Sequence, residues 1–360
     1  PWNDADYGGA ILPTNGNMIA EDNEINKAYL PTGFGTRRVD SIDPNLTREY
    51  NVENSISIER EIISGVSASV GFYRRSFHNI ITNDKGYEGL YSRDRSLSFS
   101  DWRTVSVVSP MNGEVFDVYD IKNISSLSNV DNLITNPDGH KRVYTGIEYS
   151  LNARLPGGGN VITSLTTQRT ITNECDVTDN PNELRFCDRF NIPALYNGVN
   201  FKNEFKFAAY YPLPYEMQAS IVFNSVTGRP TSDIQRVDEL LPINWLIDRN
   251  TTYTAAQCAG KPCTAGAKVI PDMIMSSLTT PLAPAGTEHV LPRLNMVNVS
   301  FKKTLNAGGL QYEPQFEIYN LTNSSIHYSE RSANYGTSSY GVPNQVLLGR
   351  MIRLSVQLQW

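Results

Sequence analysis

The sequence predicts an all-β protein made of long antiparallel strands, and three observations support this prediction. Apolar and polar residues alternate with a period of two in several segments, which are longer than the five or six residues of an average strand. Short turns and long polar segments alternate as the connections between them. The final segment, 345–360, divides into a mostly apolar set and a mostly polar set, so one face of this strand needs an apolar partner surface.

The alternating segments follow one another in pairs, and each pair is joined by a short turn rich in Gly, Pro, Ser or Asn. A short β-like piece at 115–121 is expected to form a hairpin within a loop. Four pairs and the closing segment make about nine long strands: 50–62 with 66–73, 143–155 with 161–171, 201–211 with 215–224, 297–305 with 310–318, and 345–360.

The connections between the pairs are much longer than those within them, at about 81–140, 172–198 and 227–292. Connections beyond about 12–15 residues are uncommon in compact soluble domains. Bacterial outer-membrane barrels have short turns on the periplasmic side and long loops outside the cell. We therefore predict an antiparallel transmembrane β-barrel for residues 46–360 and an extracellular loop region for residues 1–45.

The number of strands indicates that the barrel is larger than this chain. With about nine strands, the first and the last run in the same direction, whereas neighbours in a closed antiparallel barrel run in opposite directions. The sequence also opens without Met and without a signal segment. We expect residues 46–360 to be the C-terminal part of the barrel, with a plug and an N-terminal domain outside this sequence.

Composition limits which partners and which cellular compartment are expected for this chain. The net charge is −6 and no basic run occurs, so nucleic acid is not an expected partner. No stretch of 18 apolar residues predicts a transmembrane helix. The cysteines fall into two close pairs, Cys175 with Cys187 and Cys258 with Cys263. Two local disulfides in an oxidising compartment are favoured over a metal site.

Charged residues recur at the polar parity of the predicted strands. They are expected to line a hydrated lumen, rather than to form an acid–base pair, and they are Glu53, Glu59, Glu148, Lys202, Glu204, Lys206, Lys302, Glu313, Glu317 and Arg353. The opposite parity of the closing segment is apolar and forms the expected assembly strand: Ile352, Leu354, Val356, Leu358 and Trp360.

No catalytic or cofactor-binding motif occurs in the sequence, so an enzyme is not expected and no cofactor is predicted. The four histidines are scattered in or near loops, and none stands at metal-ligand spacing: His78, His140, His289 and His327.

Several loop and turn motifs together resemble one family: 45–50 (NLTREY), 179–188 (DNPNELRFCD), 211–215 (YPLPY), 333–340 (ANYGTSSY) and 348–353 (LGRMIR). They are similar to the C-terminal barrel of TonB-dependent-receptor-like proteins, specifically Oar-like proteins of acidobacterial type that carry a carboxypeptidase-regulatory-like domain. The resemblance implies a bacterial outer-membrane barrel of about 22 strands with a plugged lumen.

The implied partners are outer-membrane lipid, the barrel-assembly machinery that reads the terminal strand, and a ligand captured by the long loops. A TonB-type energy-coupling protein would act through the N-terminal part. Two alternatives remain open at the level of sequence. One is an outer-membrane structural or adhesion barrel that displays loops without active transport, and the other is a soluble secreted β-protein.

Overall fold

The structure is a computed structural model that describes residues 40–81, 93–94, 97–128, 132–175, 180–191, 201–227, 243–283 and 291–359. The chain divides into two compact units, Pro1–Ser41 and Ile42–Trp360, and the second contains nearly all the described residues. No helix among these residues is long and apolar enough to cross a membrane. The described helices are short 3₁₀ turns, and the remaining regular structure is β-strand.

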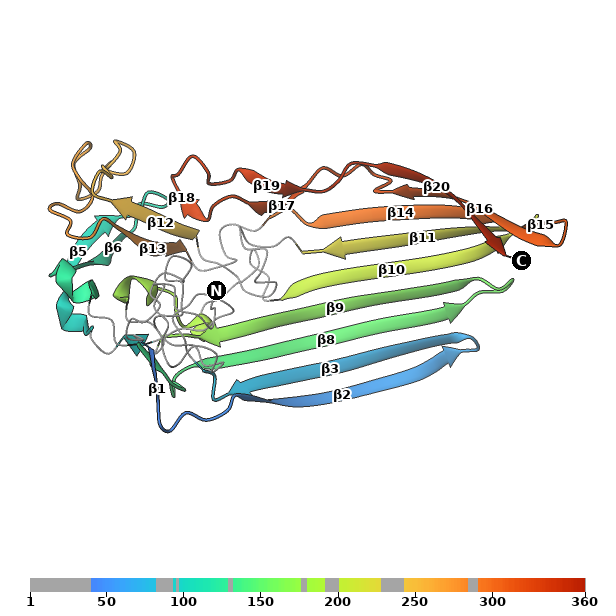
Figure 1. Cartoon of the computed structure of the whole chain (residues 1–360), viewed down its shortest axis with the longest axis horizontal. Helices are drawn as coiled ribbons and strands as arrows, with labels where there is room; N and C mark the ends of the chain where they lie inside the picture. The colour runs from blue at the N-terminus through green and yellow to red at the C-terminus, as the bar shows by residue number, and fades with distance from the viewer. Residues whose placement is uncertain are drawn as a thin grey trace, which may run out of the picture. The chain divides into compact units, whose positions relative to one another are not determined.

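A large sheet of antiparallel strands dominates the second unit (Figure 1). Long strands that follow one another along the chain are neighbours in the sheet, and β15 continues β14 along the side of β16. In sheet order the strands are β2 (Tyr50–Ile63), β3 (Val66–His78), β8 (Lys141–Arg154), β9 (Asn160–Asn173), β10 (Lys202–Leu213), β11 (Met217–Val226), β14 (Leu294–Lys303) with β15 (Leu305–Ala307), β16 (Leu310–Tyr319) and β20 (Met351–Gln359). The predicted all-β antiparallel class and the nine long strands are confirmed.

The register gives the large sheet two different faces, because residues paired directly across strands point to the same side. One row contains Ile58, Val70, Tyr149, Leu165 and Phe205. The row next to it contains Glu59, Ser69, Ser150, Ser164 and Lys206. We call the side of the first row the apolar face and the side of the second the polar face. Period-two alternation in the sequence therefore continues across neighbouring strands.

Short and long connections leave the large sheet at opposite ends, as the sequence predicts. The turn at Ser64-Gly65 has only two residues, and Gly65 adopts a φ of 81° that favours glycine. Gly157 and Gly158, at φ 85° and 91°, fill the same role between β8 and β9. Long connections occupy the other end: 79–140, 174–201, 227–293 and 320–350.

The long connections contain strands of their own, which pair into small sheets. The main pairs are β5 (Trp102–Val108) with β6 (Val115–Ile121), β12 (Ile243–Asp248) with β13 (Ser277–Ala283), and β17 (His327–Glu330) with β19 (Pro343–Val346); β18 (Asn334–Tyr335) runs parallel to β12. The predicted hairpin at 115–121 is therefore confirmed. The remaining short elements are β1 (Asp40–Ile42), β4 (Arg93–Asp94), β7 (Asn132–Ile134), η2 (Phe99–Asp101), η3 (Ile124–Ser128), η4 (Pro181–Glu183) and η5 (Arg189–Asn191).

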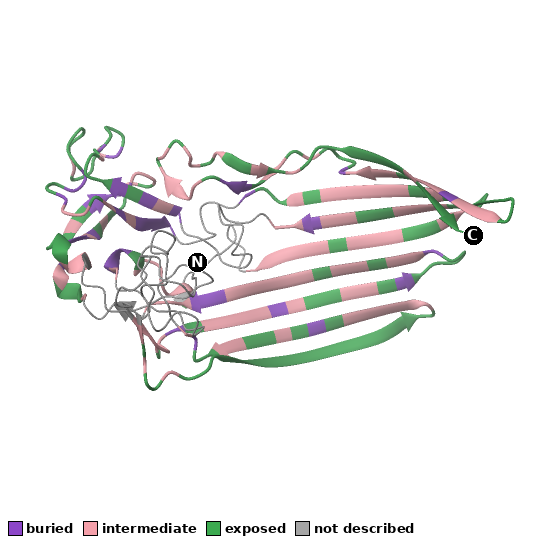
Figure 2. Ribbon diagram, viewed as in Figure 1, coloured by how far each residue is buried: buried purple, intermediate pink, exposed green. Residues whose placement is uncertain are grey.

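The buried hydrophobic core lies among these connections and not against the large sheet. Buried residues gather in β12, β13 and nearby segments, whereas the long strands are mostly exposed or half-buried (Figure 2). We call this region, formed by β5, β6, η4, β12, β13, β17, β18, β19 and residues 249–276, the connection lobe. Its core comprises Val107, Val108, Val118, Ile243, Trp245, Ile247, Tyr253, Val269, Ile270, Met273, Leu278, Leu282 and Ala283.

The closing segment differs from the single strand expected over 345–360. The structure ends β19 at Val346, leaves 347–350 irregular, and begins β20 at Met351. The backbone of the irregular stretch is held elsewhere. Leu347 N–H donates to the carbonyl of Ile326, and the buried Asn320 side chain donates to the carbonyl of Leu348 at 2.9 Å. These bonds replace ladder hydrogen bonds, so local alternation alone could not show the break.

The irregular stretch should depend on Asn320. This residue has a left-handed φ of 51°, and its side chain also bonds both the N–H and the carbonyl of Ser324. Asn320→Ala should destabilise this corner by about 2–3 kcal/mol. The change removes buried hydrogen bonds, and alanine tolerates a positive φ less well than asparagine does. Hydrogen exchange of amides 347–350 should accelerate. Ser325→Ala, an exposed change in the same turn, should leave exchange unchanged; equal exchange in both variants would contradict this account.

Candidate functional site

The register places all ten charged residues singled out in the sequence on the polar face: Glu53, Glu59, Glu148, Lys202, Glu204, Lys206, Lys302, Glu313, Glu317 and Arg353. They come from six strands spread over the second unit: β2, β8, β10, β14, β16 and β20. Their role as a lumen lining stays a prediction. The structure thus shows that these side chains share one surface, which is the first candidate site.

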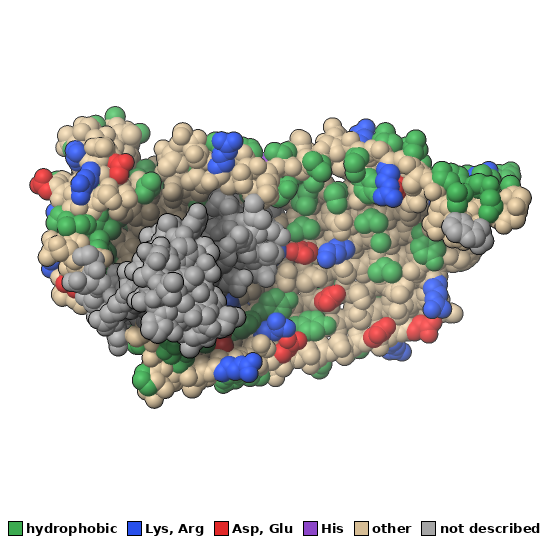
Figure 3. Space-filling model, viewed as in Figure 1, with side chains coloured by type: hydrophobic (Ala, Val, Ile, Leu, Met, Phe, Trp, Pro, Cys, Tyr) green, Lys and Arg blue, Asp and Glu red, His purple; other side chains and the backbone are tan. Residues whose placement is uncertain are grey.

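Many charges on the polar face form ion pairs with a neighbour. Lys202 lies 2.8 Å from Glu204 on the same strand, and the Lys302–Glu313 pair is 3.2 Å long. Further pairs join Arg353 to Glu317 at 3.2 Å and Glu53 to Arg75. Figure 3 shows acidic and basic side chains together among uncharged groups on one face of the sheet.

The polar face carries as many carboxylates as cations in its strands. The carboxylates are Glu53, Glu59, Glu61, Glu148, Glu204, Glu313 and Glu317, and the cations are Arg75, Arg142, Arg154, Lys202, Lys206, Lys302 and Arg353. Rings of one charge sign give channels their preference for cations or anions. A balanced face does not favour either sign of ion.

Hydroxyl groups and aromatic rings also lie on the polar face. The hydroxyls of Ser69 and Ser150 lie 2.6 Å apart in the row between Glu59 and Lys206. The rings of Tyr73 and Tyr144 lie over Gly71 and Gly146, where a Cβ atom would meet them. In the described residues, no three His, Cys, Asp or Glu side chains lie close enough to hold a metal ion. The polar face therefore offers hydrogen-bonding groups for solute or protein contact.

The second candidate site is the connection lobe, which a buried carboxylate holds together. Asp120 on β6 is fully buried and accepts hydrogen bonds from Arg103 at 2.7 and 3.0 Å. It also accepts from the N–H groups of Ile274 and Met275 at 2.8 and 3.0 Å. Arg103 donates further to the carbonyl of Asp272 at 2.7 Å. This network fastens the first long connection to the third.

The second connection joins the connection lobe through Arg185. Its guanidinium lies 3.8 Å from the ring centroid of Phe116, and it pairs with Glu114 at 2.7 Å. It also donates to the carbonyl of Pro281 at 2.9 Å. The Asn182 side chain accepts a hydrogen bond from the N–H of Tyr119 and donates one to the carbonyl of Tyr119, as the backbone of a paired strand would. Three connections are therefore fixed to one another by hydrogen-bonded side chains.

The fourth connection also reaches the connection lobe. β18 pairs with β12, and Asn244 N–H donates to the carbonyl of Ala333 at 2.9 Å. Tyr335 packs against the core of the lobe and meets Tyr340 edge to face at 5.2 Å. The long connections consequently present a preformed surface rather than four independent loops.

The structure pairs the cysteines in the two combinations expected from the sequence. Cys175–Cys187 closes a loop in the second connection, and Cys258–Cys263 closes one in the third. Both cysteines of the second pair pack against the core of the connection lobe. Disulfides of this kind restrict the unfolded chain and hold exposed loops in place.

The histidines are separated in the structure. His78, at the end of β3, stacks on Tyr50 with ring centroids 5.0 Å apart, and His327 lies 3.3 Å from Glu330. His140 is buried just before β8, and neither of its ring nitrogens has a hydrogen-bond partner among the described residues. His289, like Trp360, lies outside the described residues. No histidine cluster forms among the other three.

Sequence reasoning missed Asp120, Arg103 and Arg185, since all three lie in the long polar connections, Asp120 within the β-like piece at 115–121. The alternation of Val105 and Val107 with polar neighbours was a signal for the strand that carries Arg103. No local pattern indicates that Asp120 meets a backbone more than 150 residues away.

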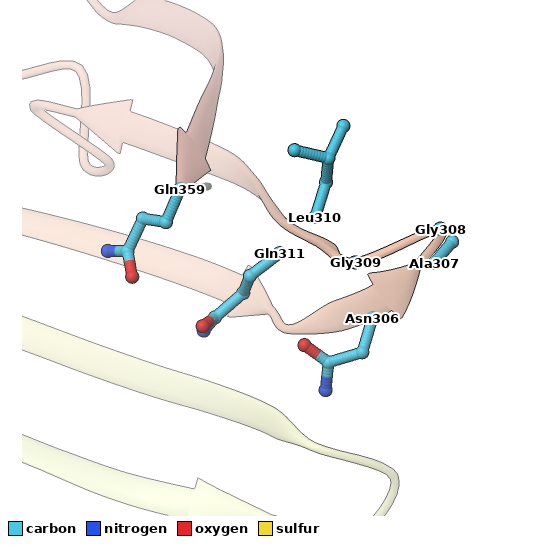
Figure 4. Close-up of a pocket in the computed structure, with 7 residues that line it drawn as sticks. All are labelled: Asn306, Ala307, Gly308, Gly309, Leu310, Gln311 and Gln359. Atoms are coloured by element: carbon cyan, nitrogen blue, oxygen red, sulfur yellow. The ribbon is translucent and has the colours of Figure 1, made fainter.

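A shallow hollow lies at the short-turn end, beside the hairpin of β15 and β16 (Figure 4). It is lined by Asn306, Ala307, Gly308, Gly309, Leu310, Gln311 and Gln359. None of these side chains carries a charge, and the two glycines lie at positive φ in the turn. The hollow is a consequence of the tight turn and does not gather reactive groups.

Comparisons with known proteins give little further information. No protein-family model matches the sequence, and no curated protein matches it. Among solved structures, the chain is similar to the outer membrane transporter YddB from Escherichia coli, at 11% sequence identity and a TM-score of 0.42. The similarity covers 87% of this chain and 33% of that chain, so this chain spans about a third of that transporter's length.

Asp120→Asn should loosen the connection lobe without disrupting the large sheet. The change removes the buried carboxylate charge that accepts hydrogen bonds from the half-buried Arg103 and from two backbone N–H groups, which costs about 1.5–3 kcal/mol. Limited proteolysis should cut residues 97–128 and 243–283 faster, while the long strands of the large sheet stay protected. Asp117→Asn, an exposed change on the same strand, is the control. Unchanged cleavage in Asp120→Asn would show that the network does not hold the lobe.

Acid should weaken the region around His140. Burial, with a smaller contribution from Arg142, lowers the pKa of His140 from 6.5 to about 4. The unfolded state therefore binds a proton that the folded state does not, and stability should fall as pH decreases from about 6.5 to 4. The total loss is about 3 kcal/mol. His140→Phe should flatten this part of the pH dependence of thermal unfolding, whereas an unaltered slope would exclude His140 as its source.

Proposed function

We propose that this chain is part of an outer-membrane β-barrel receptor or transporter. In this proposal the apolar face meets lipid, the polar face lines the interior and the connection lobe lies outside the cell. The observation that carries the proposal is the separation of side chains between the two faces of the nine long strands. The apolar face carries no carboxylate in any of these strands, whereas the polar face carries seven.

The exposure of the apolar face supports lipid as its surroundings. Ile58 is 66% exposed and Leu354 is 78% exposed, and similar residues continue across the sheet. Soluble monomers rarely expose a contiguous apolar surface that extends across a whole sheet. A bilayer accepts such a surface, and strands of nine to fourteen residues are long enough to cross it when tilted. Backbone groups remain satisfied along the sheet because every inner strand pairs on both sides.

The arrangement of connections supports the orientation. Bacterial barrels place short turns in the periplasm and long loops outside. Here the long connections also carry both disulfides, which persist in oxidising surroundings. A lobe with its own core can present a fixed set of side chains to a ligand, so that less ordering accompanies binding.

The finer assignment is a receptor of TonB-dependent type. It rests on the Oar-like motifs in the sequence and on the balanced polar face, which suits contact with a plug as well as with solute. The proposed partners are outer-membrane lipid, the barrel-assembly machinery, a TonB-type energy-coupling protein and an unidentified ligand. The proposal gives the chain no catalytic role. The proposed location is the bacterial outer membrane.

The core of the connection lobe favours a second candidate, an adhesion or structural barrel that displays the lobe. Thirteen buried residues in the connections form a core of their own, as in a domain that presents a fixed surface. Uptake assays separate the two candidates. A receptor should accumulate its ligand in an energy-dependent manner, whereas a display barrel should bind a partner at the surface and accumulate nothing.

The assignment of faces predicts opposite responses to one charge at adjacent positions. Leu165 lies on the apolar face of β9, four residues before Arg169 and five after Asn160. Thr166 lies on the polar face, paired with both Glu148 and Glu204. Leu165→Arg should destabilise the folded protein by about 2–4 kcal/mol, because a cation would enter the middle of the lipid. Thr166→Arg should be tolerated, since two carboxylates flank it.

Heat-dependent gel mobility of the protein extracted from outer membranes would measure the folded fraction of each variant. A lower unfolding temperature for Leu165→Arg alone supports the proposal. Equal losses in both variants would reject the assignment of the two faces, and with it the membrane function.

A further inference from the structure

Every charged side chain on the apolar face of the long strands is a cation. These residues are Arg60, Arg74, Lys141, Arg169 and Lys303. They lie toward the ends of their strands. Arg74 and Arg169 each lie four residues before the last residue of β3 and β9, on the long-connection side. Arg60 and Lys303 lie toward the short turns. The charged groups at the borders of the apolar face are therefore all of the sign that attracts anions.

Three of the cations form a cluster on the adjacent strands β3, β8 and β9. Arg74 pairs with Thr145, and Thr145 pairs with Arg169, so the two arginines are separated by two strand spacings, or about 10 Å between Cα atoms. Either guanidinium can reach the space above Thr145. Lys141 lies on the same face of β8, about 13 Å farther toward the long connections.

The cluster has no acidic partner among the described residues. Arg74 and Lys141 are exposed, and no ion pair joins either of them, or Arg169, to a carboxylate there. The guanidinium of Arg169 instead lies over the ring of Phe201, 4.7 Å from its centroid, which does not neutralise the charge. The uncompensated charge contrasts with the paired charges of the polar face.

Exposed and half-buried apolar side chains begin directly below the arginines. The next row contains Ile56, Phe72 and Ile147, and the row after it contains Ile58, Val70 and Tyr149. Above the arginines, toward the long connections, lie the stacked rings of Tyr50 and His78. Aromatic rings of this kind are enriched at the interface of a membrane with water. The surface thus has a cationic part and an adjoining apolar part, in the order in which an anionic lipid presents its headgroup and acyl chains.

We propose that Arg74, Arg169 and Lys141 bind the phosphate group of an anionic lipid in the leaflet next to the connection lobe, with its acyl chains on Ile56, Phe72 and their neighbours. Guanidinium groups suit phosphate because they donate two parallel hydrogen bonds to it. A free phosphate ion would use the arginines but not the apolar rows. This inference rests on the proposal that the apolar face meets lipid.

The test uses the intact protein, purified from outer membranes in a non-ionic detergent and titrated with phosphatidylglycerol or phosphatidylcholine. Native mass spectrometry counts the lipids that remain bound. The protein should prefer phosphatidylglycerol, and Arg74→Ala/Arg169→Ala should weaken that binding about thirtyfold, because each cation near a membrane surface contributes about a factor of five. Arg74→Lys/Arg169→Lys should retain most of the binding. Arg154→Ala, which removes a cation from the polar face, should have no effect.

Equal binding of the two lipids, or unchanged phosphatidylglycerol binding in the alanine variant, would overturn the proposal. An equal loss in Arg154→Ala would also overturn it, since any cation would then suffice. Competition by millimolar inorganic phosphate at constant ionic strength would identify an ion site instead of a lipid site. A protein that stays monomeric without detergent would refute the membrane function itself. Failure of headgroup selectivity in a detergent-dependent protein would refute only this inference.

Discussion

The structure depends on one geometric constraint, the alternation of side chains between the two faces of a β-strand. In a sheet of nine long strands this constraint divides the side chains into two sets, and direct pairing carries each set from strand to strand. A shift of one residue anywhere would exchange the two faces. The long registers between β2, β3, β8 and β9 contain a single irregularity, next to the turn at Ile63, so the separation of charge from apolar surface persists across them.

The two regions of the second unit obtain stability from different sources. The connection lobe has a water-excluding core and buried hydrogen-bonded charges, as a soluble domain does. The large sheet has few buried residues, and its apolar face remains open. Its backbone hydrogen bonds alone supply little net stability in water, where the unfolded chain bonds to solvent. Lipid changes this balance, because unpaired backbone groups are much less favourable there. The large sheet is therefore suited to lipid surroundings, which the connection lobe does not need.

Sequence reasoning recovered the long strands and the short turns, because period-two alternation and turn residues are local signals. It also paired the cysteines, which lie close together along the chain. It did not recover the connection lobe, whose contacts join distant residues: the Arg103–Asp272 bond spans 169 positions, and the bond from Val108 to Tyr253 spans 145. Nor could it find the end of β19, because Asn320 and Asn323 hold residues 347–350 by side-chain bonds that leave no periodic trace.

The same difference in contact distance bears on how the protein assembles. Each pair of long strands closes a turn of a few residues, so its ladder forms with little loss of chain entropy. The connection lobe requires segments from four connections to meet, and each long-range contact closes a larger loop. Strand pairing brings the starts and ends of these connections to one end of the sheet and shortens the loops that remain to be closed. The sheet thereby favours formation of the lobe, and the lobe in turn holds together the ends of strands that are not neighbours.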